Sequence, residues 1–352
     1  MSNETQLYRQ GDFPIFQNRM YDSAAQARAC LRGDIGLVQN KHTGLVYNAA
    51  FKPELMAYDA DYQNEQAHSP AFRNHLEHVA GIVERHLGTD GLVEVGCGKA
   101  FFLELLQSRG CAITGFDPTY EGSNPSVERH YFGEGVQVKA RGIVLRHVLE
   151  HVQHPLQFLS GLRDANQGGL IYIEVPCLDW ILRQRAWFDI FYEHVNYFRL
   201  SDFYRMFARV VDAGHLFGGQ YLYVVAELTS LREPVAGTDG VLTFPNDFLG
   251  AAECSAKSQE RGREAVWGAA SKGVIYALLR ERLGVPVSIL IDINPAKCGR
   301  FVPGTGLQVM SPAEGLSLLQ GGDVIYVMNS NYMNEIREMT GNRFSLKGVE
   351  RE

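Results

Sequence analysis

The chain has 352 residues, 45% of them hydrophobic, so it is long enough for two or three domains with substantial cores. Its formal net charge of −7 and the absence of any Lys/Arg-rich run argue against a nucleic-acid partner. Every apolar run is much shorter than the roughly 20 residues of a membrane span, and no secretory signal is visible, so we expect a cytoplasmic protein without a membrane partner. The six cysteines contain no C-x-x-C pair, which predicts free thiols.

Three regions follow one another along the chain. Residues 1–75 hold short apolar pieces between polar turns, and we expect an irregular N-terminal domain there. Residues 76–230 alternate helix-like and strand-like patterns, with strands expected at 91–97, 111–117, 142–148 and 168–175. This alternation predicts an α/β, Rossmann-like fold with a parallel sheet covered on both faces. After a turn-rich stretch and a helix expected over 248–264, the alternation restarts, so residues 231–352 predict a smaller Rossmann-like domain.

A glycine loop ends the first of these strands, where residues 92–98 read L-V-E-V-G-C-G. Gly96 and Gly98 allow a tight turn and close approach of a ligand at a helix start. The third glycine of a dinucleotide fingerprint is replaced by Phe101, and the carboxylate of Glu94 would repel a pyrophosphate. Asp117 ends the next strand, where it can accept hydrogen bonds from ribose hydroxyls. This arrangement favours S-adenosylmethionine (SAM) as the cofactor, and the alternative is a strand-to-helix turn that binds nothing.

Another motif, R-H-V-L-E-H-V at residues 146–152, falls at the end of a further strand. Ligands of open α/β sheets bind at the carboxyl ends of the strands, where all of these motifs lie. Here the sequence resembles the class I SAM-dependent methyltransferases, in which V-L-E-H-V after the fourth strand is a familiar signature. The resemblance implies that Arg146 and His147 contact the cofactor and that His151 belongs to the active site. The alternative for His151 is an ordinary residue at a helix start.

A narrower resemblance covers nearly the whole chain. Residues 188–198 read F-D-I-F-Y-E-H-V-N-Y-F, and the C-terminal half contains W-G-A-A-S-K-G at 267–273 and D-I-N-P-A-K-C-G at 292–299. These segments are similar to the C-methyltransferase family that includes the nucleoside-diphosphate 4-keto-deoxysugar C-3 methyltransferases. The family pattern Y-H-E-H-x-x-Y-F is matched by Glu193, His194, Tyr197 and Phe198. Phe191 stands where the family has a tyrosine, which puts the sugar substrate in question.

The resemblance implies catalytic roles in this segment. A carbon nucleophile must first lose a proton next to a carbonyl group, and a histidine near neutral pH is a suitable base. We expect His194 to be that base, Glu193 to orient it or raise its pKa, and His151 to assist. The alternative for His194 is a satisfied core histidine. Tyr197 is expected to contact the substrate.

Two more contacts are expected on the basis of the resemblance. Lys272 and Gly273 follow a C-terminal strand and predict binding of a substrate phosphate, although an ordinary βα turn is the alternative. Tyr62 is expected to reach over the SAM pocket.

The same family normally carries four zinc-binding cysteines in its N-terminal domain. Here the second pair is replaced by Asn40 and Thr43, and only Cys30 remains nearby. Three thiolate ligands of a tetrahedral site are missing, so we expect no structural zinc and no other metal.

The first hypothesis is therefore a SAM-dependent methyltransferase of a small biosynthetic metabolite, with C-methylation of a nucleotide-linked keto-sugar as the specific case. A SAM-dependent O- or N-methyltransferase is the alternative. A nicotinamide-dependent oxidoreductase is disfavoured because the C-terminal half lacks G-x-G-x-x-G, and a silent ligand-binding protein is disfavoured by the intact acidic residues and His194. The sequence does not indicate the oligomeric state.

Overall fold

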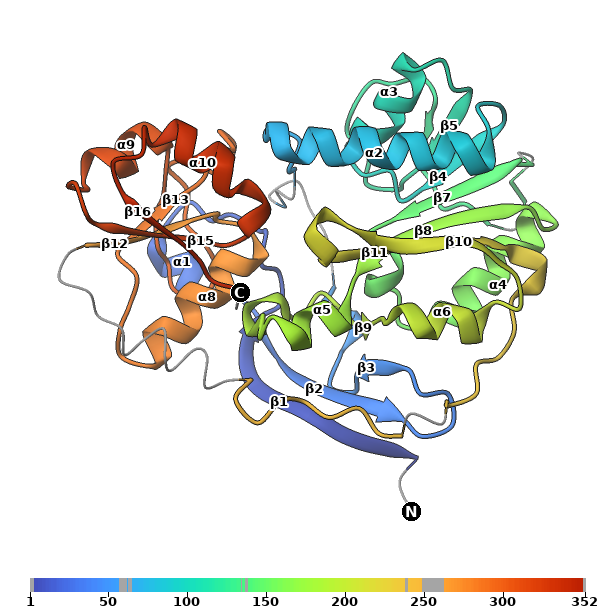
Figure 1. Cartoon of the computed structure of the whole chain (residues 1–352), viewed down its shortest axis with the longest axis horizontal. Helices are drawn as coiled ribbons and strands as arrows, with labels where there is room; N and C mark the ends of the chain where they lie inside the picture. The colour runs from blue at the N-terminus through green and yellow to red at the C-terminus, as the bar shows by residue number, and fades with distance from the viewer. Residues whose placement is uncertain are drawn as a thin grey trace.

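The computed structural model describes residues 3–56, 62, 65–133, 135–136, 139–237, 240–248 and 263–350. The helix expected over 248–264 lies almost wholly outside these residues. The described parts of the chain form three β-sheets with helices packed around them (Figure 1). The domain boundaries expected near residues 75 and 230 stay predictions.

The central sheet has the strand order β10-β11-β8-β7-β4-β5-β6. The five strands from β8 to β6 are parallel, and β11 and β10 add an antiparallel edge. The Rossmann-like α/β fold expected for this region is thereby confirmed. The strands are β4 (Leu92–Val95), β5 (Ile113–Phe116), β6 (Val127–Glu128), β7 (Gly142–Arg146), β8 (Leu170–Pro176), β10 (Val210–Leu216) and β11 (Tyr221–Glu227).

Helices cover both faces of this sheet, because its strands bury side chains in both directions. In β7, Ile143 packs in one core with Leu159 of α4, whereas Val144 packs in another core with Val79 of α2. Figure 1 shows α2 and α3 on one side of the sheet and α4 and α6 on the other. The helices are α2 (Pro70–Leu87), α3 (Phe101–Ser108), α4 (Pro155–Asn166), α5 (Leu178–Arg183) and α6 (Leu200–Met206).

The N-terminal region is an antiparallel sheet with the order β1-β2-β3-β9, so the expectation of an irregular domain was wrong. Register shifts between Gln6 and Tyr8 and between Gln10 and Phe13 interrupt the alternation of side chains that identifies a strand in a sequence. The elements are β1 (Glu4–Pro14), α1 (Ala24–Arg28), β2 (Arg32–Asn40), β3 (Val46–Asn48) and β9 (Asn196–Tyr197). The last strand comes from the F-D-I-F-Y-E-H-V-N-Y-F segment.

The C-terminal sheet is parallel, with the order β14-β13-β12-β15-β16, and confirms the second Rossmann-like unit. Its first strand turns tightly into a helix: a Cβ on Gly273 would lie 1.8 Å from the carbonyl oxygen of Gly268, so only glycine fits there. The elements are β12 (Glu264–Trp267), α8 (Ser271–Arg282), β13 (Ile289–Ile291), β14 (Val309–Met310), α9 (Pro312–Ser317), β15 (Val324–Val327), α10 (Met333–Met339) and β16 (Ser345–Gly348).

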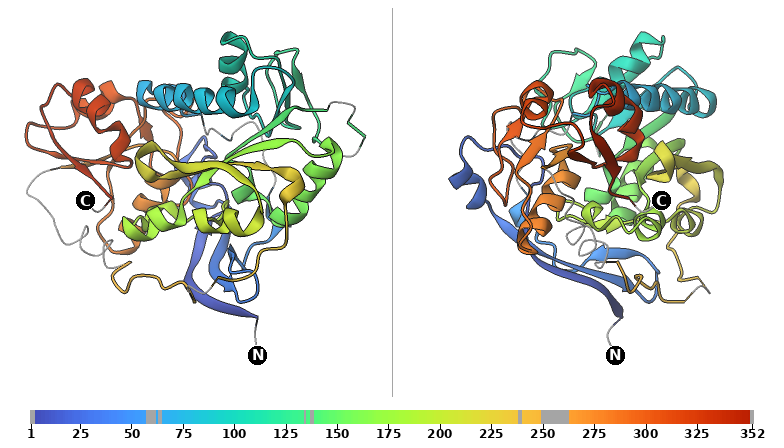
Figure 2. Two further views of the ribbon diagram at one scale, coloured as in Figure 1. Left: turned by 45° about the vertical axis from the view of Figure 1, so that its right-hand side comes forward. Right: turned by 60° about the vertical axis from the view of Figure 1, so that its left-hand side comes forward.

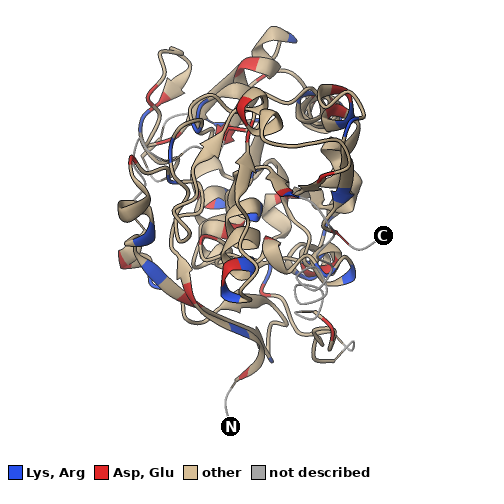
Figure 3. Cartoon of the chain, turned by 90° about the vertical axis from the view of Figure 1, so that its left-hand side faces the viewer, with Lys and Arg blue, Asp and Glu red and all other residues tan. Residues whose placement is uncertain are grey.

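The N-terminal strands lie beside α8 of the C-terminal unit, whereas helices lie between them and the central sheet (Figure 2). Arg282 of α8 donates a 3.0 Å hydrogen bond to the carbonyl oxygen of Gly11, and Tyr21 pairs as a β-bridge with Phe301. Acidic and basic residues are interspersed over the side of the molecule shown in Figure 3. No helix in the described part of the chain has the length and apolar character needed to cross a membrane.

Candidate active site

A cavity of about 370 Å³ lies where the carboxyl ends of the two parallel sheets face each other. Its wall combines loops from all three regions of the chain. Contributors include Asn18, Tyr62, Glu94, Gly96, Gly98, Arg146, His147, Glu150, His151, Glu193, His194, Gly268, Lys272, Gly273 and Asp292. Most of the residues singled out in the sequence are thus brought to one place.

The loop after β4 has the backbone that its glycines predict. Gly96 and Gly98 have positive φ angles of 72° and 54°, and a Cβ on Gly96 would lie 2.5 Å from the side chain of Val148. Asp117 fixes this loop, because its carboxylate accepts hydrogen bonds from the backbone N–H groups of Gly98 and Thr119, both at 2.8 Å. Among the described residues, Asp117 is not part of the cavity wall, so its contact with a ribose stays a prediction.

Glu94 is a buried acid that faces this loop from β4. It is 3% exposed, and its Oε2 has no hydrogen-bond partner among the described residues. Burial raises the pKa of its carboxyl group to about 8, although Arg146 lowers it. Burying a carboxyl oxygen without a hydrogen-bond partner costs free energy unless a ligand supplies that partner. A cationic group such as the ammonium of SAM fits this position.

Behind the motif at 146–152, Glu174 of β8 organises a buried polar network. Its carboxylate accepts hydrogen bonds from Arg146 at 2.9 Å, His75 at 2.8 Å and the Tyr172 hydroxyl at 3.1 Å. Burial works against the charge of Glu174, but Arg146 and the neighbouring histidines hold its pKa well below the usual range. Arg146 also lies over the ring of Phe102, 4.5 Å from its centroid. Sequence reasoning missed Glu174, although an acid inside the apolar run L-I-Y-I-E-V-P is a detectable signal.

His147 lies between two carboxylates. Its Nδ1 is 3.3 Å from Glu150 and its Nε2 is 3.4 Å from Glu174. Burial opposes a charge on the ring, but these two acids raise its pKa to about 9. His147 is therefore a cation at neutral pH, and its charge is balanced inside the protein.

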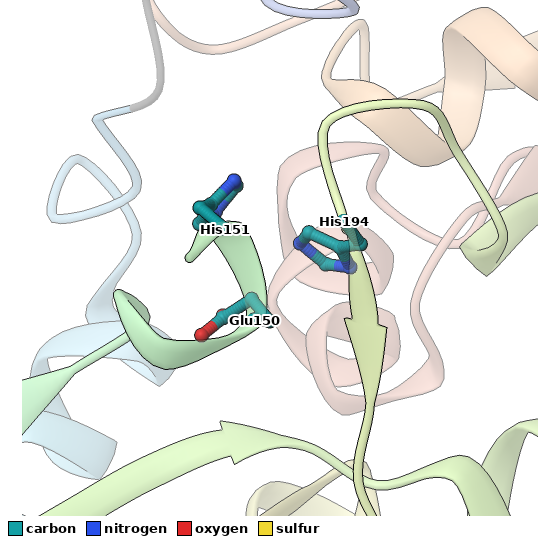
Figure 4. Close-up of side chains that lie close together, drawn as sticks. All are labelled: Glu150, His151 and His194. Carbon is teal, nitrogen blue, oxygen red and sulfur yellow. The ribbon is translucent and has the colours of Figure 1, made fainter. Parts of the chain in front are cut away.

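His151 and His194, which both line the cavity, lie close to each other (Figure 4). Their ring centroids are 4.9 Å apart, and the His194 ring centroid lies 4.0 Å from that of Phe191. His151 donates a 2.9 Å hydrogen bond from Nδ1 to the backbone carbonyl of Glu193, which leaves a lone pair on Nε2. Burial, together with the electrostatic effects of His151, His147 and Lys272, holds the pKa of His194 well below its usual value.

Within the described structure, no hydrogen bond joins the carboxylate of Glu193 to His194. It accepts hydrogen bonds from the backbone N–H of Gln17 at 2.7 Å and from the Tyr62 hydroxyl at 2.5 Å. Burial raises the pKa of Glu193, and His151 and these donors counteract the rise. Sequence reasoning missed Gln17 and also Asn18, which donates to Ser271 at 2.9 Å, because their partners are more than 150 residues away.

The segment at residues 188–198 is mostly irregular: it begins in the 3-10 helix Trp187–Asp189 and has a strand only at Asn196–Tyr197. The Tyr197 hydroxyl donates to the backbone carbonyl of Phe191 at 3.1 Å, and Tyr197 is not part of the cavity wall in the described structure. Asp189 pairs with Lys272 at 3.1 Å. The ammonium of Lys272 also lies 4.9 Å from the Trp180 ring centroid, so this cation already has protein partners. The substrate contacts of Tyr197 and Lys272 stay predictions.

The loop after β12 repeats the arrangement of the loop after β4. Asp292, after β13, accepts a 2.7 Å hydrogen bond from the backbone N–H of Ala269, as Asp117 does from Gly98. Ala270 precedes α8 and provides no side-chain hydrogen bond to cap the helix. Backbone N–H groups of the first turn are therefore available at the cavity.

Comparison with known proteins agrees with this geometry. A family model described as a methyltransferase domain matches residues 64–210, which include the loop after β4 and the histidine-containing motif. The chain is a SAM-dependent methyltransferase with a class I domain. Over 310 residues it is 23% identical to the C-methyltransferase NovU of Streptomyces niveus, covering 74% of this chain and 72% of that protein.

Solved structures show more limited similarity. The 1,6-didemethyltoxoflavin-N1-methyltransferase of Burkholderia thailandensis is 13% identical and covers 52% of this chain and 95% of its own, with a TM-score of 0.34. The N-methyltransferase NodS of Bradyrhizobium japonicum is 16% identical and covers 49% and 93%, with a TM-score of 0.35.

Proposed function

We propose that this enzyme transfers the methyl group of SAM to a carbon atom of a nucleotide-linked keto-sugar, with His194 as the general base. The observation that carries the proposal is the position of the His151–His194 pair on the same cavity wall as Glu94 and the glycine loop. The similarity to NovU, whose name describes a C-methyltransferase, also supports carbon as the acceptor atom.

On the cofactor side, the protein contributes charge and shape. SAM supplies a methyl group on a positively charged sulfur, so the enzyme mainly has to align it with the nucleophile. Glu94 would receive the ammonium group of the cofactor, since its buried Oε2 has no other described partner. Gly96 and Gly98 leave room for close approach at the strand end.

On the acceptor side, His194 is suited to take a proton from a carbon next to a carbonyl group. Burial and the neighbouring cations keep its ring neutral, so a lone pair is available at neutral pH. Once His194 has accepted this proton, the imidazolium would stabilise the negative charge of the enolate until the enolate carbon attacks the methyl group. Glu193 acts as a positioning residue, because its backbone carbonyl fixes the tautomer of His151.

The start of α8 is the proposed place for a substrate phosphate. Its free backbone N–H groups and helix dipole favour an anion. Lys272 is already neutralised by Asp189, so it would contribute less than a free ammonium group.

Deuterium exchange tests the base directly. The enzyme is incubated in D₂O with a nucleoside-diphosphate 4-keto-deoxysugar and demethylated SAM, so that proton removal occurs without methyl transfer. We expect exchange at the carbon next to the carbonyl in the parent and a large loss in His194→Ala. His78→Ala, which removes an exposed histidine of α2, is the matched control.

The alternative is transfer to oxygen or nitrogen, which Phe191 favours because it replaces the expected tyrosine hydroxyl with an apolar ring. That reaction requires no carbon–hydrogen exchange. Methyl transfer from labelled SAM without any deuterium exchange would therefore reject C-methylation and support this alternative.

A further inference from the structure

Three side chains of types that can ligate a metal ion lie close together on the cavity wall. One ligand atom from each of Glu150, His151 and His194 can be chosen so that all three lie within 4.8 Å of one another (Figure 4). We propose that these three residues bind a divalent first-row transition-metal ion. The proposal goes beyond methyl transfer and concerns a site that the N-terminal cysteine pattern does not predict.

Glu150 provides the strongest indication of a missing ligand. The residue is 1% exposed, and its Oε2 is buried without a hydrogen-bond partner in the described part of the chain. Its other oxygen is 3.3 Å from Nδ1 of His147. A buried carboxylate oxygen with no partner is unfavourable, and coordination of a cation would remove that cost.

The two histidines present nitrogen lone pairs. In His151 the Nδ1–H group is held by the carbonyl of Glu193, so Nε2 is the free acceptor. Such a hydrogen bond on the opposite nitrogen is usual for a metal-binding histidine. The ring of His194, in the described structure, makes aromatic contacts and has no side-chain hydrogen bond.

The donor set determines the kind of ion. Two imidazoles and one carboxylate suit Zn²⁺, Co²⁺ or Ni²⁺, whereas Mg²⁺ and Ca²⁺ prefer oxygen ligands. Three protein ligands leave a coordination position open toward the cavity. The positive charge of His147 disfavours a metal cation at this site, whereas the carboxylates of Glu150, Glu174 and Glu193 favour one.

Occupancy would have a consequence for catalysis, and this consequence rests on the proposed function. The lone pair of His194 cannot both coordinate an ion and accept a proton. The ion-bound form would then lack its general base.

Cobalt titration tests the site without SAM or acceptor. Protein that carries no polyhistidine tag is freed of metal with a chelator and titrated with Co²⁺, followed by visible absorption and calorimetry. We expect saturation at one ion per chain. His151→Asn and His194→Ala should each weaken binding at least about 10-fold, since even the loss of an outer hydrogen-bond partner costs 10- to 100-fold.

His78→Ala is the control and should bind as the parent does. Glu150→Gln keeps the shape of the side chain and should also weaken binding, so the test does not depend on the folding of His194→Ala. Thermal melting and SAM affinity check each variant. The absence of saturable Co²⁺ binding in the folded parent, or equal binding in Glu150→Gln and His78→Ala, would overturn the site. Deuterium exchange is measured separately on chelator-treated enzyme, so failure of the base proposal and failure of the metal site can be told apart.

Discussion

The Tyr62 hydroxyl donates a 2.5 Å hydrogen bond to Oε2 of Glu193. The bond joins the segment that precedes α2 to the turns that carry His194. Because Glu193 is 1% exposed, this donor offsets part of the cost of burying its carboxylate. Tyr62 therefore has a structural partner in addition to its expected place over the SAM pocket.

We expect Tyr62→Phe to lower the free energy of unfolding by about 1–3 kcal/mol, because it leaves a buried acceptor with one donor fewer. The pKa of Glu193 should rise further. Urea denaturation measures the change, and Tyr131→Phe, at a side chain that is 80% exposed, is the matched control. Equal midpoints for the two variants would show that the hydroxyl of Tyr62 does not stabilise the fold.

SAM binding should release a proton from Glu94 near pH 7. Without the cofactor the carboxyl group has a pKa of about 8 and is mostly protonated, and an adjacent ammonium group would favour its ionised form. Calorimetry in two buffers with different ionisation enthalpies counts the proton. Glu94→Gln should abolish the release. An unchanged proton count in that variant would show that Glu94 is not the group that releases the proton.

The same group predicts a pH dependence of stability in the cofactor-free protein. The unfolded carboxyl group loses its proton near pH 4.5, but the folded one keeps it up to about pH 8. The free energy of unfolding should therefore fall as the pH rises through this window. Glu94→Gln should reduce the slope in urea denaturation measured from pH 5 to 8.

Asp117→Ala should weaken SAM binding by about 1–3 kcal/mol, because it would remove the hydrogen bonds that we expect this residue to accept from the ribose. Since Asp117 also holds the N–H of Gly98, Asp117→Asn is the informative comparison: its carbonyl oxygen can keep the loop in place. Calorimetry gives both affinities. If Asp117→Ala binds SAM as tightly as the parent does, Asp117 does not bind the ribose.

His194→Ala should slow the chemical step by about 100- to 10,000-fold, the usual contribution of a general base. SAM affinity should change little, because we assign this residue to the acceptor side. Single-turnover methyl transfer at saturating SAM is the measurement, and thermal melting checks the fold. If the variant transfers methyl at the parent rate, His194 is structural, and His151 becomes the candidate base.

Asp189→Asn should destabilise the fold by about 3–5 kcal/mol, because it leaves the buried ammonium of Lys272 without its counter-charge. The double variant Asp189→Asn, Lys272→Met removes both charges and should recover most of the loss. Denaturant unfolding gives the free energy of unfolding of both variants and of the parent. If Asp189→Asn is as stable as the parent, the ion pair contributes nothing to stability.

The glycine loop shows what short-range patterns can predict. An apolar strand followed by G-C-G predicts a turn into a helix, and positive φ angles at Gly96 and Gly98 agree with it. The order of β4, α3, β5, β7, α4 and β8 was predictable for the same reason, since each of these elements carries its own periodicity. Glu94, in the same stretch, is recognisable because an acid within an apolar strand is unusual.

Features built from distant segments could not be predicted in this way. Glu150 and His194 belong to separate turns, and only the fold brings their side chains together. Gln17 reaches Glu193 through a backbone N–H, which leaves no trace in side-chain patterns. The N-terminal sheet was missed because its bulges interrupt the alternation, and its last strand, β9, lies far along the chain.

The pairing of β3 with β9 ties the segment that carries His194 to the first fifty residues. Val46 pairs with Tyr197, three residues beyond His194. The position of the His194 imidazole therefore depends on the register in which β9 pairs with β3. The N-terminal sheet thus helps to position the part of the cavity wall that contains His194. A chimera that exchanges it for the corresponding unit of another methyltransferase would have to preserve this register, because a slip along β3 would displace the histidine together with the strand.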